Sequence, residues 1–214
     1  MKQFAVIGLG RFGASVAITL TKMGYEVLAV DEDEEMVNSI ADEVTYVAQA
    51  NVLDERALKS LGLRNFDAVI VAIGQEIKAS ILATVMLKEM GVGKIVAKAN
   101  DELHGRVLQK VGADIVVFPE REMGIRVAHS LASRNIIDQI HLSPEYSIAE
   151  MVAPSRFVGK SLTESAMRQK HGITVMAIRR GEDIIISPEA SQIVQKGDIL
   201  LVIGRDAKLE SLGE

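Results

Sequence analysis

A glycine-rich hexapeptide near the start of the chain constrains the fold most strongly. The sequence GLGRFG at residues 8–13 matches the pattern GxGxxG, and it lies between a β-branched run, Gln3–Ile7, and a segment with helical periodicity. In a strand–turn–helix unit Gly8 permits the tight turn, Gly10 lets a ligand approach the backbone, and Gly13 allows close packing. The N–H groups that open the helix then face a bound anion. This context predicts a Rossmann-type domain that binds a nucleotide.

The alternation of strand and helix continues through the first 118 residues. Short runs that are apolar on both faces suit parallel strands covered by helices above and below, and glycines end most of the helical segments. We therefore predict the α/β class, with a Rossmann-type doubly wound parallel sheet. The expected strands are 3–7, 26–30, 45–48, 68–73, 95–99 and 115–118, and the expected helices are 12–23, 33–42, 54–61, 76–90 and 102–111.

The pattern changes in the last third of the chain. An amphipathic segment, Glu120–Ser133, predicts a helix that either packs on the core or acts as a crossover or dimerisation helix. Turn-forming residues at 135–144 predict a linker. Beyond it, strands at 147–152, 173–179, 184–186 and 199–203, a helix at 162–170 and a turn at 180–182 predict a second, smaller α+β domain. The expected domains are 1–134 and 145–214.

Composition excludes several classes of function. A net charge of -5 and an aromatic content of 4% argue against binding to nucleic acid, which needs clustered cations and stacking surfaces. The absence of cysteine excludes disulfides, thiol catalysis and thiolate metal sites. Apolar stretches are too short to cross a bilayer, and we find no signal-peptide pattern, so we expect a cytoplasmic protein.

Two charged residues indicate which nucleotide is bound. Asp31 ends the second predicted strand, where a carboxylate accepts hydrogen bonds from ribose hydroxyls. No basic residue lies in Val30–Glu35 to offset a 2′-phosphate, so NADP is disfavoured. Arg11 is either a solvated surface residue or a bidentate contact to a terminal phosphate. The second interpretation suits ATP or ADP better than a dinucleotide, although NAD stays open.

Other candidates lie at the carboxyl ends of predicted strands, where ligands bind in such folds: Asn51, Ala72–Gly74 and Lys98. Asn51 and Lys98 fit ordinary polar loop positions equally well. Glu120 opens a helix, where it either favours the helix dipole or holds Mg²⁺ or another cation beside phosphates. The candidate nucleotide-binding residues are Gly8, Gly10, Arg11, Phe12, Gly13, Asp31, Asn51, Ala72, Ile73 and Lys98.

Catalytic machinery is missing from the sequence pattern. His141 and His171 follow the first domain, in a loop and at a helix end, and neither has an obvious partner in sequence. His104 and His129 lie on predicted helices. We therefore expect a binding protein and not an enzyme. A small NAD-dependent oxidoreductase and a stand-alone nucleotide sensor stay open as alternatives.

The motifs together resemble the RCK regulatory subunits, regulators of potassium conductance, of Ktr/Trk-type potassium uptake systems. The likeness begins in AVIGLGRFG at 5–13 and VLAVD at 27–31, and continues in NFDAVIVAIG at 65–74, GAD at 112–114, FPER at 118–121 and KGDIL at 196–200. This resemblance implies dimers that assemble into an octameric ring beneath a membrane potassium channel subunit, at the inner face of the cell membrane. ATP favours potassium flux and ADP an inactive ring in this family.

The resemblance also implies roles for particular residues. Arg11 resembles the family's γ-phosphate contact, Asp31 its ribose carboxylate and Glu120 its cation-binding glutamate. The C-terminal domain resembles one that in several members binds cyclic di-AMP at a dimer interface. For this second effector we expect Arg168 to pair with phosphate over an apolar floor, unless the apolar residues simply fill the core. The candidate residues are Leu162, Arg168, His171, Ile173 and Pro188.

Overall fold

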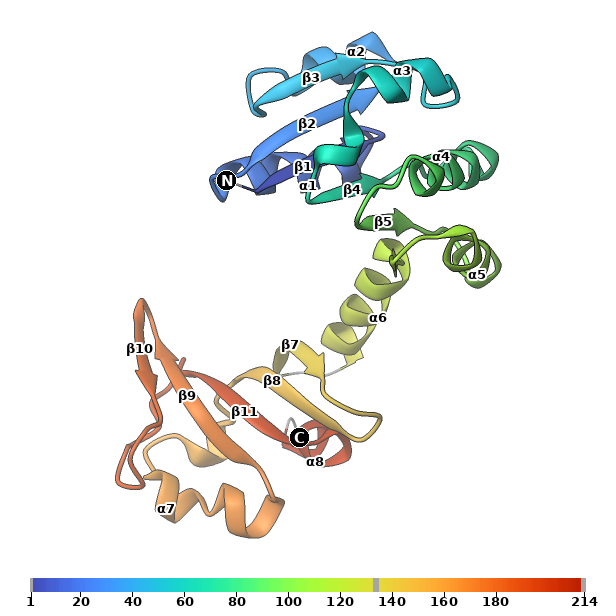
Figure 1. The fold of residues 1–214 in the computed structure, drawn as a ribbon. Helices are drawn as coiled ribbons and strands as arrows, with labels where there is room; N and C mark the ends of the chain where they lie inside the picture. The colour runs from blue at the N-terminus through green and yellow to red at the C-terminus, as the bar shows by residue number, and fades with distance from the viewer. Residues whose placement is uncertain (1, 133–134, 213–214) are drawn as a thin grey trace. The chain divides into compact units, whose positions relative to one another are not determined.

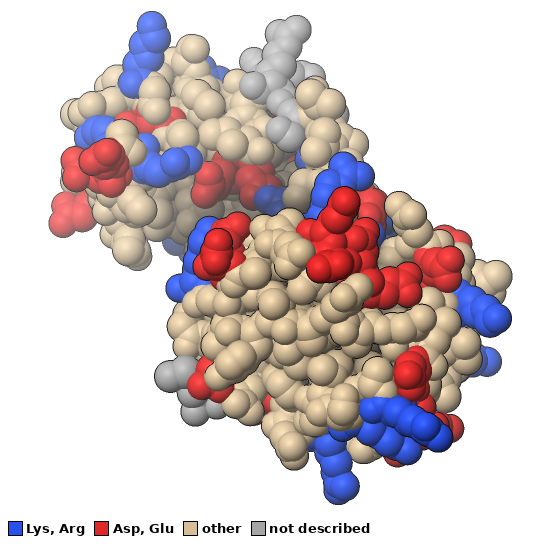
Figure 2. Space-filling model, turned by 90° about the horizontal axis from the view of Figure 1, so that it is seen from above, with Lys and Arg blue, Asp and Glu red and all other residues tan. Residues whose placement is uncertain are grey.

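The computed structural model describes residues 2–132 and 135–212. The chain forms two compact units, Met1–Glu120 and Arg121–Glu214. The first unit holds a six-stranded sheet, and the second a five-stranded one (Figure 1). Among the described helices, none combines the length and the apolar character that a membrane span needs. Figure 2 shows positively and negatively charged side chains distributed over the face that it draws, with uncharged surface between them.

The first unit is a doubly wound parallel sheet with the strand order β3-β2-β1-β4-β5-β6. This confirms the predicted fold class. The order reverses between β1 and β4, so the crevice at their carboxyl ends is the topological switch point where such sheets bind ligands. The strands are β1 Gln3–Ile7, β2 Glu26–Asp31, β3 Tyr46–Gln49, β4 Ala68–Val71, β5 Ile95–Lys98 and β6 Ile115–Val117, and the helices are α1 Arg11–Lys22, α2 Glu34–Ser39, α3 Glu55–Ser60, α4 Ile77–Glu89 and α5 Glu102–Val111, with a 3₁₀ turn at Leu63–Asn65.

Two apolar layers pack on the two faces of this sheet because successive strand residues point to opposite sides. Ile7 lies in a layer with Leu87 and Leu108 of α4 and α5. Its neighbour Val6 lies in the opposite layer with Ala17 of α1. Burial of each such large side chain contributes about 1.5–3 kcal/mol. The predicted pattern of strands that are apolar on both faces follows from these two layers.

The second unit is an antiparallel sheet with the order β10-β9-β11-β8-β7, as expected for an α+β domain. One face of the sheet carries the core, in which Met151 and Leu200 pack with Leu209 of α8. The elements are α6 Pro119–Ala132, β7 Ile136–His141, β8 Tyr146–Val152, a 3₁₀ turn Ser155–Phe157, α7 Leu162–Ser165, a π-helical turn Met167–His171, β9 Thr174–Arg180, β10 Asp183–Ile186, β11 Ile199–Arg205 and α8 Asp206–Ser211.

The structure corrects the predicted linker at 135–144, because Ile136–His141 forms β7. β7 is an edge strand with polar residues and a bulge near Asp138, which hides the two-residue alternation. The two units divide within α6, earlier than the boundary expected near 134, since Arg126 of α6 binds Asp138 of β7 through two hydrogen bonds of 3.2 and 2.7 Å. The predicted end of this helix at Ser133 and the boundary at Arg134 lie outside the described residues.

The helix expected at 162–170 is divided into α7 and the π-helical turn. Ala166 separates them with a positive φ of 47°, a conformation that an alanine rarely adopts and that no local pattern predicts. The break turns Met167 into the core. On α6, the predicted apolar stripe does not pack on a core, since Met123, Val127 and Leu131 are exposed, the last by 82%.

Candidate ligand site

A cleft of about 350 Å³ opens at the carboxyl ends of β1, β2 and β4, at the switch point of the parallel sheet. Several of the predicted nucleotide-binding residues come together on its walls. The lining residues are Gly8, Gly10, Asp31, Glu32, Asp33, Met36, Asn51, Val52, Leu53, Ala72, Ile73, Gly74, Gln75, Glu76 and Ala79.

Each of the three glycines in the loop is required for a different structural reason. Gly8 has a φ of +93°, and a Cβ there would lie 3.0 Å from the backbone nitrogen of Ile73. A Cβ at Gly13 would lie 1.8 Å from the carbonyl oxygen of Gly8, so α1 approaches the loop only because Gly13 lacks one. A Cβ at Gly10 would meet no described atom within 4 Å. The backbone at Gly10 is therefore open to a ligand, as the motif predicts.

The Asp31 carboxylate binds the glycine loop directly. Its Oδ2 accepts the backbone N–H of Leu9 at 2.6 Å, and its Oδ1 accepts the N–H of Asp33 at 3.0 Å. Each carboxylate oxygen has two acceptor positions, so both oxygens can still accept a ribose hydroxyl. Asp31 thus holds the loop against the end of β2 and still offers acceptors to the cleft.

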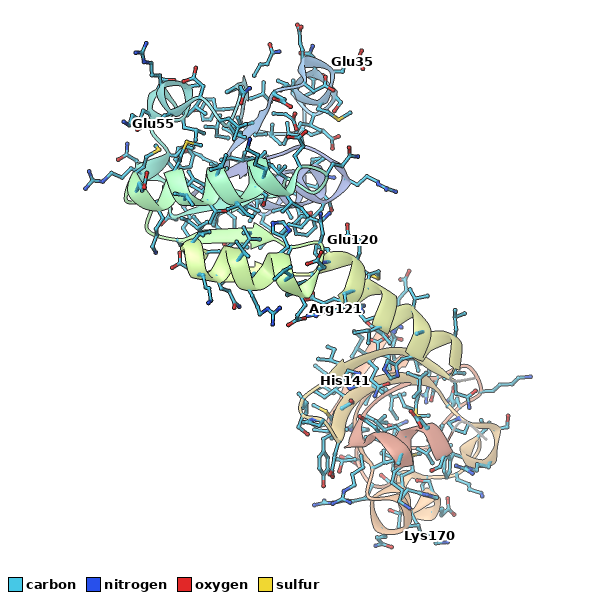
Figure 3. All side chains as sticks on the ribbon, turned by 90° about the vertical axis from the view of Figure 1, so that its right-hand side faces the viewer. Glu35, Glu55, Glu120, Arg121, His141 and Lys170 are labelled. Carbon is cyan, nitrogen blue, oxygen red and sulfur yellow. The ribbon has the colours of Figure 1, made fainter. Side chains whose placement is uncertain are left out.

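Lys98 and Glu120 form an ion pair at the edge of the first unit. Lys98 Nζ lies 2.6 Å from Glu120 Oε1, with the lysine side chain 12% exposed and the glutamate 70% exposed. Figure 3 shows Glu120 at the first turn of α6. The Lys98 hydrogen bond holds the pKa of Glu120 below its ordinary value, and the charge of Arg11 lowers this pKa further. The three charged groups therefore act on one another.

Glu120 is predicted to hold a cation, and the structure pairs its carboxylate with Lys98. Within residues 2–132 and 135–212, no group of three or more His, Asp or Glu side chains is placed to hold a metal ion. Any cation at Glu120 would need ligands supplied by phosphates or by another chain. Its role as a cation ligand stays a prediction.

Some predicted contacts lie outside the cleft wall. Arg11 is exposed at the start of α1, and Phe12 packs against the apolar layer on that face. Gly13 lies beneath Gly8, and Lys98 is paired with Glu120. Sequence reasoning missed Glu76 and Gln75, which follow β4 in the chain. The rule that ligands bind at the ends of strands, extended two residues past Gly74, would have found them.

A second cleft of about 330 Å³ lies in the C-terminal unit, between α7, the following turn and β9. Four of the five residues predicted for a second effector line it: Leu162, Arg168, Ile173 and Pro188. Ile173 is fully buried, so it also belongs to the core. His171 does not line the cleft, because its ring packs edge-on against Phe157 at 6.3 Å between centroids. Burial lowers the pKa of His171, and the charge of Arg156 lowers it further.

The fold defines a class: a Rossmann-type domain with an open cleft at its switch point, followed by a small antiparallel α+β domain. Residues 4–119 match the TrkA-N domain and residues 147–214 the TrkA-C domain. The chain is 50% identical over 203 residues to the Ktr system potassium uptake protein C of Bacillus subtilis, covering 95% of this chain and 92% of that protein. It is 42% identical over 208 residues to the Ktr system potassium uptake protein A of Vibrio alginolyticus, covering 97% and 94%. The chain belongs to the family of RCK regulatory subunits of Ktr potassium uptake systems.

Solved structures show the same fold. The crystal structure of the GsuK RCK domain superposes with a TM-score of 0.70 at 19% identity, covering 99% of this chain and 47% of that one. The chain therefore spans about half the length of that relative. The matched Ktr proteins are components of a potassium uptake system and do not belong to an oxidoreductase family. The enzyme alternative loses its support.

Proposed function

We propose that the first unit binds ATP and ADP in the cleft at the glycine loop, and that the difference between them controls potassium flux through a membrane channel subunit. The observation that carries the proposal is the bond between Asp31 and Leu9, which brings the ribose acceptor and the phosphate loop into one cleft.

The charge of the cleft supports an adenosine nucleotide without a 2′-phosphate. Glu32 and Asp33 line the cleft next to Asp31, so a further negative group at that position would be repelled. NAD stays the alternative ligand. A GsuK channel structure is described as bound to NAD, and another as bound to ADP. Those ligands are bound by GsuK. They support the proposal that a cleft of this fold can accept either a dinucleotide or a mononucleotide.

We propose that the charges beside the phosphate loop distinguish ATP from ADP. The N–H groups at the start of α1 face the loop, and Arg11 is the first residue of that helix. An arginine there gains a bidentate contact with a third phosphate that ADP lacks. A ligand shifts a conformational equilibrium only by its difference in affinity for the two states, and this contact supplies such a difference. The charge of Arg11 also lowers the pKa of Glu120, and we propose that this electrostatic interaction couples the phosphate loop to the first turn of α6.

Assembly and partners follow from the family and from α6. The exposed apolar residues Met123, Ile125, Val127 and Leu131 give this helix a surface suited to a second copy of the chain. We propose dimers that form an octameric ring, bound to the Ktr membrane subunit at the cytoplasmic face.

We also propose that cyclic di-AMP binds at the second cleft. Arg168 supplies the cation there, and Leu162 and Pro188 supply apolar contacts.

Calorimetric titration of the full-length chain with ATP, ADP, NAD and NADP tests the nucleotide proposal. We expect ATP and ADP to bind, NADP to bind more weakly than NAD, and Asp31→Asn to weaken all ribose ligands. Asp42→Asn is the matched control, because Asp42 is exposed and does not line the cleft. Equal binding by both variants would remove Asp31 from the site. Turnover of a nicotinamide cofactor would support the oxidoreductase alternative, and a partner outside the membrane would support the stand-alone sensor.

A further inference from the structure

His104 is a buried histidine that the proposed nucleotide contacts do not use. It lies in the first turn of α5 and is 3% exposed. Its backbone N–H donates to the N-cap residue Asp101 at 2.8 Å. Figure 3 shows α4 and α5 side by side, and the buried residues of α4 that face this layer are apolar or hydroxyl-bearing: Ala79, Ser80, Ala83, Thr84 and Leu87.

Two hydrogen bonds lead from the imidazole of His104 to the wall of the ligand cleft. The backbone N–H of Asn100 donates to His104 Nδ1 at 3.3 Å. The side-chain amide of Asn100 donates in turn to the carbonyl oxygen of Gly74. Gly74 lines the cleft in the loop that follows β4. The position of this wall therefore depends on Asn100, and Asn100 depends on an acceptor at Nδ1.

The other ring nitrogen of His104, Nε2, forms no hydrogen bond with the described residues. Since Nδ1 accepts a hydrogen bond, the proton of the neutral ring lies on Nε2. Nε2 is buried and has no hydrogen-bond partner among residues 2–132 and 135–212. A buried donor without a partner destabilises the folded state, so a leucine would fill this position without that loss. The useful property of histidine here is its acceptor at Nδ1, on the side of the cleft.

We propose that His104 is a positioning residue for the nucleotide cleft, which holds the Gly74 wall through Asn100 only while its imidazole is neutral. This inference rests on the proposed nucleotide binding, and it adds a dependence of that binding on protons. A protonated imidazole donates from both nitrogens, so Nδ1 could no longer accept the N–H of Asn100.

The surroundings of His104 favour the neutral imidazole, so the ring is protonated only at acidic pH. Burial lowers the pKa of His104, and the charge of Asp101 raises it by less. The facing α4 residues and β6, Ile115–Val117, carry no charge. The ring is therefore neutral near pH 7, and the Nδ1 bond is lost as the pH falls below the ordinary histidine value of about 6.5. Nucleotide affinity should fall over the same range.

Two variants distinguish the effect of the hydrogen-bond acceptor at position 104 from the effect of protonating the imidazole. His104→Asn places an amide oxygen where Nδ1 lies and cannot titrate, whereas His104→Leu removes the acceptor. Calorimetry with ATP on the full-length chain should show His104→Leu about three- to tenfold weaker than wild type at about pH 8. His104→Asn should bind as wild type does there, and should lack the additional loss of affinity that wild type shows as the pH is lowered stepwise below the ordinary histidine value of about 6.5.

A control variant and a folding check distinguish a specific effect of His104 from general effects of pH or misfolding. His141→Asn, in the C-terminal unit, should keep the wild-type pH profile, and titration of the phosphates is common to all variants. Thermal unfolding checks that each variant folds. Wild-type affinity in His104→Leu, or the wild-type pH profile in His104→Asn, would overturn the inference while nucleotide binding stood.

Amide hydrogen exchange provides a readout that needs no nucleotide. Residues 72–76 should exchange faster in His104→Leu than in wild type, because the Gly74 carbonyl loses its support. If exchange there is unchanged, the inference fails. If wild type binds no nucleotide but this exchange does increase, the proposed function fails and the positioning of the wall by His104 stands.

Discussion

Asp31 accepts the backbone N–H of Leu9 at 2.6 Å, so the last residue of β2 is bonded to the loop that follows β1. This bond makes one residue responsible for both the shape of the phosphate loop and the ribose acceptor. Substitution of Asp31 should therefore affect every ligand that carries a ribose, whatever its phosphates.

Asp31→Ala is expected to weaken ATP, ADP and NAD alike, by about 1–3 kcal/mol, because a charged acceptor and the support of the loop are both lost. Isothermal calorimetry measures the change. Asp31→Asn keeps one oxygen for Leu9 and should lose less. An alanine variant with wild-type affinity for all ligands would show that Asp31 does not contact them.

Arg11→Ala is expected to leave ADP affinity nearly unchanged and to reduce the conformational difference between the ATP and ADP states. The reason is that the arginine contact with the third phosphate provides the difference in affinity that drives the switch. Small-angle scattering of both states checks this. Arg56→Ala is a control, because Arg56 is an exposed residue of α3. Two profiles separated as widely in Arg11→Ala as in wild type would exclude Arg11 as the sensor.

Glu120→Gln is expected to remove the gain in ATP affinity that Mg²⁺ produces in wild type, because a carboxylate beside phosphates supplies a hard oxygen ligand. Lys98 and Arg11 hold the pKa of Glu120 below its ordinary value. The wild-type Mg²⁺ effect should therefore persist as the pH falls to about 5, and disappear only as the carboxylate protonates below about pH 4.5. An equal Mg²⁺ effect in the variant would leave Glu120 as the partner of Lys98 alone.

Arg168→Ala is expected to abolish binding of cyclic di-AMP to the full-length chain while leaving ATP affinity unchanged. Arg168 supplies the cation of the second cleft, which belongs to a different unit from the glycine loop. Calorimetry with both ligands on one variant checks this, with Lys170→Ala as a nearby control. Saturable binding of the dinucleotide by Arg168→Ala would place that ligand elsewhere.

Asp198→Asn is expected to destabilise the chain by about 1.5–3 kcal/mol, since it removes the charge from the two hydrogen bonds that Arg180 donates to Asp198. Arg180 Nη2 lies 2.8 Å from Asp198 Oδ2, and the Asp198 side chain is 1% exposed. The Arg180 hydrogen bond holds the pKa of Asp198 below its ordinary value. A depressed folded pKa means that the stabilisation is complete above the unfolded value and is lost as the pH falls through the folded one. Urea unfolding at about pH 7 and about pH 3 should show a smaller difference between variant and wild type in acid.

The sequence allowed prediction of the sheet and of several residues that line the cleft, among them Gly8, Asp31 and Ala72, because these depend on local patterns. The glycine spacing, the strand ends at Asp31 and Ala72, and the alternation of apolar runs all repeat at short range. Asn51 also lines the cleft, since it follows a strand that ends on the ligand side.

Other features depend on contacts between distant residues and could not be predicted. The pair of Lys98 with Glu120 joins two elements, and each residue alone fits a solvated edge position. β7 is stabilised by pairing with β8, and its polar edge resembles a linker. Ala166 adopts a positive φ, a conformation that alanine disfavours, because the turn around it buries Met167 in the core. The bonds from His104 through Asn100 to Gly74 likewise join three segments that only the fold brings together.

Nucleotide affinity and particle mass should be determined together on one sample, by calorimetry and light scattering, with ATP, ADP and NAD compared. We expect ATP and ADP to bind one site per chain, in a particle of eight chains whose scattering profile differs between the two ligands. Absence of binding by both nucleotides, or identical profiles for the two saturated states, would contradict the proposal that this chain is a nucleotide-driven switch.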